Sequence, residues 1–202
     1  LCGQMDGINW RVTLSPEGEP LIYDSMHNCG CYHQFFPTRR LVVRPPPNTL
    51  DESAFVPARA PDIEPGQRLV LRIASRTHHI EAIYAAVDGA GGAERYQWAD
   101  YDQLRAMPLP DGGSRSLFEP VTGLIAGTAR KERWILWPMG IPSPGAMRQW
   151  GHHATAFVGK RYFDDPCLMA QSFDLAGATV NGNTQRALIT DRFCGGHNMG
   201  NE

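Results

Sequence analysis

The stretch WRVTLSPEGEPLIY, residues 10–23, decides the fold class. Trp10, Val12 and Leu14 alternate with polar residues, which is the period-two pattern of a strand with one buried face. The following PEGE, residues 16–19, is typical of a turn, and the apolar residues after it predict a returning strand. The sequence therefore predicts an antiparallel hairpin near the N-terminus and, with it, a β-rich fold.

Working outward from this hairpin, short apolar segments bounded by glycine and proline predict further strands. These segments are residues 41–43, 67–75, 80–87, 133–137 and 153–158, with a last hairpin around Asn181-Gly182. Three short helices are expected because Asp100, Ser143 and Asp165 are good residues at a helix start. The helices are expected at residues 100–107, 143–151 and 165–173.

The expected fold is mostly β (α+β): a single mixed or antiparallel sheet, or a sandwich, with about three short helices. Residues 45–66 open with three prolines, which cannot donate hydrogen bonds within a sheet, so they are expected to be a surface connection. No composition shift divides the 202 residues. We therefore expect one globular domain over residues 1–202.

Composition excludes some classes of partner. The net charge is −2 and no dense basic stripe is present, so nucleic-acid binding is not expected. No run of about eighteen apolar residues occurs, so no transmembrane segment is expected either. Because the chain opens at Leu1 without a methionine or signal sequence, we expect a fragment of a longer precursor, with the remainder or another protein as partner. The sequence does not specify a small-molecule ligand.

The sharpest chemical feature is the run HNCGCYH, residues 27–33. On an extended strand, alternate side chains share one face, and here those are His27, Cys29, Cys31 and His33. Sulfur and imidazole are ligands of zinc and copper. Same-face neighbours lie about 6–7 Å apart, however, so Gly30 must bend the chain or other ligands must contribute.

The Cys-Gly-Gly-His run near the C-terminus offers Cys194 and His197 as such ligands. The chain has five cysteines, and an odd number also permits two disulfides with one remaining thiol. A non-catalytic, disulfide-stabilised binding or assembly module is therefore the alternative to a metal site. Cys29 and Cys31 are in addition a candidate redox pair, because a disulfide between such near neighbours is strained and easily reduced.

Two His-His pairs predict a second site. Neighbouring residues of a strand point to opposite faces, so one histidine of each pair can serve a given site. His79 shares a face with Glu81, and together with His153 they are candidates to hold a metal and water for hydrolysis. The alternatives are that these histidines have structural roles, or that Cys31 and a histidine of the later pair form a thiol hydrolase.

Together these patterns favour an exported bacterial domain, periplasmic or extracellular, that binds zinc or copper in a structural or catalytic role. Lysine is scarce beside arginine, which is typical of a GC-rich bacterial source. The residues do not decide whether the protein is an enzyme.

Overall fold

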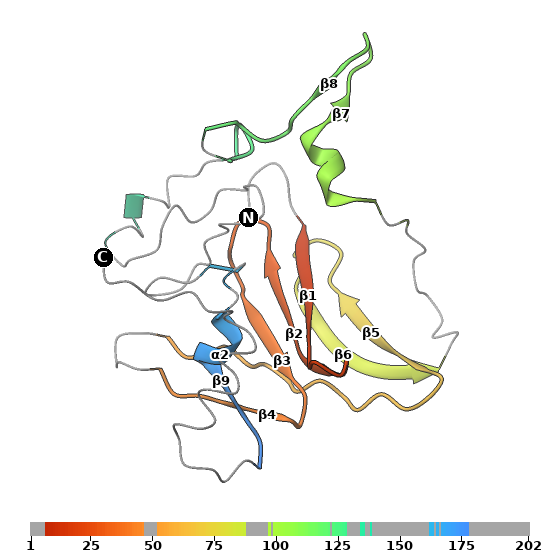
Figure 1. The fold of residues 1–202 in the computed structure, drawn as a ribbon, viewed down its shortest axis with the longest axis vertical. Coiled ribbons are helices and arrows are strands. Elements are labelled where there is room, and N and C mark those ends of the chain that lie inside the picture. The colour runs from red at the N-terminus through yellow and green to blue at the C-terminus, as the bar shows by residue number, and fades with distance from the viewer. Residues whose placement is uncertain are drawn as a thin grey trace.

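The computed structural model describes residues 7–46, 52–87, 97, 99–121, 123–128, 134–135, 138, 162–163, 165 and 167–177. Over these residues the fold is mostly β, as expected (Figure 1). The strands form several small antiparallel sheets, so the expected single sheet is wrong. Short strands separated by long connections cannot all continue one ladder of hydrogen bonds, and each hairpin pairs mainly with itself.

The central sheet has the order β1-β2-β3 and is formed by Ile8–Leu14, Pro20–His27 and Gln34–Pro37. Its first two strands are the hairpin predicted from residues 10–23, with Arg11 opposite Asp24. The turn between them is closed by a 2.9 Å hydrogen bond from the Gly18 amide to the Ser15 carbonyl. Gly18 has a φ of +86°, a conformation that glycine adopts without steric cost.

The other strands form two-stranded sheets. They are β5 (Gln67–Ile73) with β6 (Ile80–Val87), β4 (Leu41–Val43) with β9 (Phe173–Leu175), and β7 (Met107–Pro108) with β8 (Ser114–Arg115). The strands predicted at 41–43, 67–75 and 80–87 are thus confirmed. β5 ends two residues early because the His78 amide donates to the Ala74 carbonyl, at 2.9 Å, and closes the turn.

Helices are fewer than expected. In the described part of the chain, α2 is an α-helix over Leu168–Ser172, and its first and last residues are both described. The other helix with described ends, η1 (Tyr101–Arg105), is a 3-10 helix. The Asp100 cap is confirmed, since its side chain accepts a 2.9 Å bond from the Asp102 amide, but the strand at Met107 leaves room for one tight turn only. The helix expected at 165–173 is shorter at both ends: the Asp165 side chain accepts a 2.8 Å bond from the Cys167 amide, but Cys167 is the N-cap of α2 and Phe173 already belongs to β9.

Residues 133–137 are also corrected where the structure describes them. Trp134 and Ile135 are helical and expose 68% and 71% of their surface, so they do not form the expected buried strand. An aromatic run cannot be assigned to a strand or a helix by its apolar character alone. The helix expected at 143–151, the strand at 153–158 and the hairpin at 181–182 lie outside the described residues.

Over residues 45–46 and 52–66 the long connection contains no strand. It nevertheless contacts the central sheet. The Phe35 amide donates to the Phe55 carbonyl at 2.9 Å, and the Ala60 amide donates to the Pro37 carbonyl at 3.1 Å. Within the described ranges, no helix is long and apolar enough to cross a membrane.

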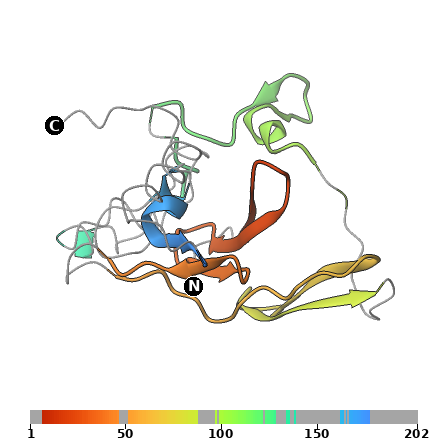
Figure 2. The same ribbon diagram turned by 60° about the horizontal axis from the view of Figure 1, so that its bottom comes forward.

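Both faces of the central sheet are covered, which makes two cores. On one face, Ile22 and Phe35 pack with residues of α2 and with Phe173, and Figure 2 shows α2 and β5–β6 on different sides of this sheet. On the other face, Tyr23 and Phe36 pack with Leu69, Ile80 and Ile83 of the β5–β6 hairpin. Successive side chains of β2 therefore point alternately into one core and into the other.

The side chain of Tyr23 makes the stability of the fold depend on pH. Its ring is stacked on that of Trp10, with ring centres 5.6 Å apart. Burial raises the pKa of Tyr23 above its ordinary value of 10.0. As pH rises above 10, the unfolded tyrosine loses its proton first, so the free energy of unfolding falls. We expect Tyr23→Phe to fall less steeply than the wild type in urea unfolding series between about pH 8 and pH 11. Tyr84→Phe, at a residue 41% exposed, is the control that should keep the wild-type slope.

Candidate functional site

Residues 28–33 join β2 to β3 by a tight turn. The Gly30 amide donates to the His27 carbonyl at 2.8 Å, and the His27 amide donates to the Cys31 carbonyl at 3.0 Å. Gly30 and Tyr32 have φ values of +87° and +55°, in the left-handed region. The alternation of an extended strand is broken here, so the expectation that the four predicted ligands share one face is wrong.

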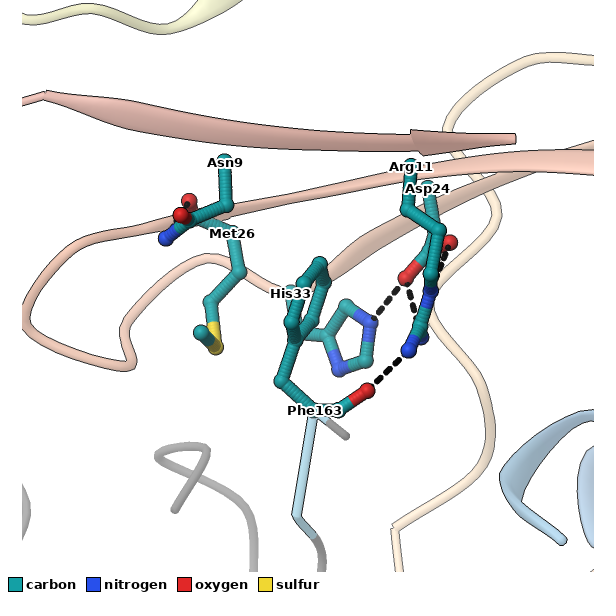
Figure 3. A network of polar contacts seen from close by, with 6 residues as sticks. All are labelled: Asn9, Arg11, Asp24, Met26, His33 and Phe163. Carbon is teal, nitrogen blue, oxygen red and sulfur yellow. Dashed lines mark hydrogen bonds and ion pairs between the residues drawn. The ribbon is translucent and has the colours of Figure 1, made fainter. Parts of the chain in front are cut away.

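The first result of this turn is a buried polar network on the α2 side of the sheet (Figure 3). Asp24 has no exposed surface. Its carboxylate accepts two bonds from the Arg11 guanidinium, at 2.9 Å from Nε and 2.7 Å from Nη2. It also accepts a 2.8 Å bond from Nε2 of His33, whose side chain is 4% exposed.

Phe163 completes this network from a distant part of the chain. The Arg11 guanidinium carbon lies 4.1 Å from the centre of the Phe163 ring, and the Arg11 Nη1 donates to the Phe163 carbonyl (Figure 3). The His33 ring lies 5.4 Å from the Phe163 ring and 4.2 Å from the Phe35 ring. A fully enclosed carboxylate cannot meet a substrate, so we assign the network to structure. The predicted ligand His33 belongs to it.

The second result of the turn is a cluster of three rings, His27, Tyr32 and His79, which we call the histidine cluster. The ring centres of His27 and His79 are 5.3 Å apart, and those of Tyr32 and His79 are 4.4 Å apart. The His27 ring also lies 5.0 Å from the Tyr32 ring. The cluster thus joins His27 of the predicted metal site to His79 of the predicted catalytic site. The sequence patterns had assigned these two residues to different sites.

Of the other predicted residues of the catalytic site and the C-terminal run, the structure describes Glu81. The Glu81 carboxylate pairs with Arg72 across the hairpin, with 3.1 Å between Oε2 and Nε. His153, Cys194 and His197 lie outside the described residues. Among those that the structure does describe, no three His, Cys, Asp or Glu side chains form a group that could hold a metal ion.

The cysteines that the structure describes are in two states. Cys29 and Cys167 are disulfide-bonded, whereas Cys31 carries a thiol. Cys29 is 1% exposed, and Cys31 is half-buried. Because a metal ligand must be a thiolate, Cys29 cannot serve as one while it is in a disulfide.

Fold and site together define a β-rich domain with half-cystines, a buried Arg–Asp–His network and a histidine cluster. No protein-family model, curated protein or solved structure matches the chain. Function is therefore inferred from the side chains themselves.

Sequence reasoning missed Arg11, Asp24, Tyr32 and Phe163. For Asp24 a signal existed, because a lone carboxylate between Ile22 and Met26 on one face of an apolar strand needs a buried partner. Its partner Arg11 also lies inside a predicted strand. Phe163 gave no local signal, since its contact spans 152 residues.

Removal of the Asp24 charge should be strongly destabilising. Asp24→Asn leaves the Arg11 guanidinium without its ion pair, and breaking a buried pair costs about 3–5 kcal/mol. The matched control is Asp62→Asn, whose pair with Arg39 has side chains 58% and 80% exposed and should contribute less than about 1 kcal/mol. Urea unfolding at neutral pH measures both. Equal losses in the two variants would contradict a structural role for the network.

Proposed function

We propose that the chain is an exported bacterial domain that binds a transition metal, zinc or copper, through the imidazoles of His27 and His79. The 5.3 Å separation of the two ring centres carries the proposal. In a tetrahedral zinc site, imidazole nitrogens lie about 2.0–2.1 Å from the ion, which puts the centres of two bound rings about 5 Å apart. The observed spacing therefore leaves room for one ion bound by both rings.

The surroundings of the two rings support the proposal. His27 is 4% exposed at the end of β2, and its amide is bonded to the Cys31 carbonyl. His79 comes from the β5–β6 hairpin, which packs on the same face of the sheet through Ile80 and Ile83. Ligands held by two packed elements lose little conformational freedom when an ion binds.

Two imidazoles leave further coordination positions for water, substrate or other ligands of this chain. His153, Cys194 and His197 are the candidates that the sequence supplies. A zinc ion with an open position acts as a Lewis acid toward water or a carbonyl group, which is the chemistry of hydrolysis. Glu81 pairs with Arg72, so we assign it no role as a base.

The cysteines support the proposed export. Disulfides form and persist in the periplasm and outside the cell, and they are rare in the reducing cytosol. Cys29 and Cys167 are both disulfide-bonded. A periplasmic or extracellular location is therefore part of the proposal.

The test measures zinc or cobalt binding to the untagged, oxidised chain by competition with a chromophoric chelator. We expect one equivalent of tight binding in the wild type. His27→Gln and His79→Gln should each weaken it by more than about 100-fold, because each removes a ligand. The absorption spectrum of the cobalt form should lose intensity in the same variants.

His78→Asn is the matched control, since asparagine tolerates the φ of +53° at this position. The ring contacts that define the histidine cluster join His27, Tyr32 and His79. This variant should keep the wild-type affinity within about threefold. Wild-type affinity in His27→Gln and His79→Gln would contradict the proposed ligands. His153→Gln, Cys194→Ser and His197→Gln then show which further side chain binds.

The half-cystines favour a second candidate function, a non-catalytic, disulfide-stabilised module for binding or assembly. It predicts two disulfides and one thiol per chain and no bound metal. Thiol titration of the denatured protein, with and without a chelator, together with elemental analysis, separates the candidates. An equivalent of metal in the native protein supports the first, and its absence at saturating zinc supports the second.

A further inference from the structure

A thiol and a half-cystine stand two residues apart in the turn between β2 and β3. Cys29 is disulfide-bonded, and Cys31 carries a thiol. The Cys29 side chain is 1% exposed, so its sulfur is shielded from thiols in solution. Cys31 is a thiol that belongs to the same turn and reaches partly to the surface.

The conformation of the turn permits a reaction between the two residues. Hydrogen bonds of 2.8 Å and 3.0 Å fold residues 30 and 31 back toward His27. Gly30, at φ +87°, lets the backbone reverse between the cysteines without a side chain in the way. Cα atoms two residues apart lie about 5–7 Å from each other, which overlaps the separation of about 4.4–6.8 Å that a disulfide spans.

We propose that Cys31 and the disulfide of Cys29 form an intramolecular thiol–disulfide exchange pair. The Cys31 thiolate attacks Sγ of Cys29, and a new sulfur–sulfur bond forms between them. The bond from Cys29 to its original partner breaks, and the partner sulfur leaves as a thiolate. That thiolate takes up one proton from solvent, which replaces the proton that Cys31 gave to solvent. The exchange is therefore redox-neutral.

The exchange changes which parts of the chain are cross-linked. The original partner of Cys29 is one of Cys2, Cys167 and Cys194, and all of these lie outside the β2–β3 hairpin. A bond from another part of the chain is thus replaced by a bond within the turn. A disulfide that closes so short a loop constrains the unfolded chain less, so exchange loosens the attachment of the released segment. It also restrains the turn that carries Tyr32 and directly follows His27.

Peptide mapping tests the proposal directly, because trypsin separates the cysteines. Cys29 and Cys31 share peptide 12–39, while Cys2, Cys167 and Cys194 fall in peptides 1–11, 162–186 and 193–202. The native protein is incubated at different pH values, acid-quenched, alkylated with N-ethylmaleimide in denaturant at low pH, and digested. Before exchange, peptide 12–39 carries the label on Cys31 and is linked to another peptide. After exchange, we expect it alone, unlabelled and two hydrogens lighter than its dithiol form, with the label on the released cysteine.

The rate supplies the second criterion. Below the ordinary thiol pKa of about 8.5, the thiolate fraction rises about tenfold per pH unit, and the exchange rate should rise with it. The rate should not depend on protein concentration, and Cys31→Ser should show no movement of the cross-link. Label that stays on Cys31 at every pH would overturn the proposal, as would a rate proportional to protein concentration. Neither readout involves a metal, so this test is independent of the proposed metal site.

Discussion

The Asp24 carboxylate is a charge with no exposed surface in the middle of a three-stranded sheet, and the surrounding structure has to neutralise it. Arg11 supplies two hydrogen bonds from the neighbouring strand, and His33 supplies one from the far end of the turn. A buried ion pair is retained at a net cost unless its geometry is good, and here both carboxylate oxygens are bonded. The constraint joins β1, β2 and the start of β3 more specifically than apolar packing does.

The same constraint orders the chemistry of residues 27–33. Because the Asp24 side chain points toward α2, His33 has to turn to that side to reach it. His27, three residues along β2 from Asp24, points to the opposite side and meets His79. One short segment thereby contributes to two sites on the two faces of one sheet. The turn between the faces holds Cys29 and Cys31, so a change in their bonding acts next to both sites.

The strands could be predicted because their information is local. Alternation in residues 10–14 and 67–73, and turn residues such as Gly18, are properties of a few neighbouring positions. The number and length of the helices were overestimated. A capping residue such as Asp100 indicates where a helix can begin, but not how far it continues. The strand that begins at Met107 limits η1 to one tight turn, and β9 limits α2 in the same way.

The sequence by itself determined the β-rich class, the first hairpin, and the residue types from which the candidate sites are built. The tertiary structure decided which of them meet: His27 with His79, and His33 with Asp24 and Arg11. The physical reason is that period-two alternation is fixed by backbone geometry within a strand, and a turn with left-handed residues resets it. Contacts between packed layers, such as that of Arg11 with Phe163, depend on the combined effect of many turns along the chain. No local sequence pattern predicts that combined effect.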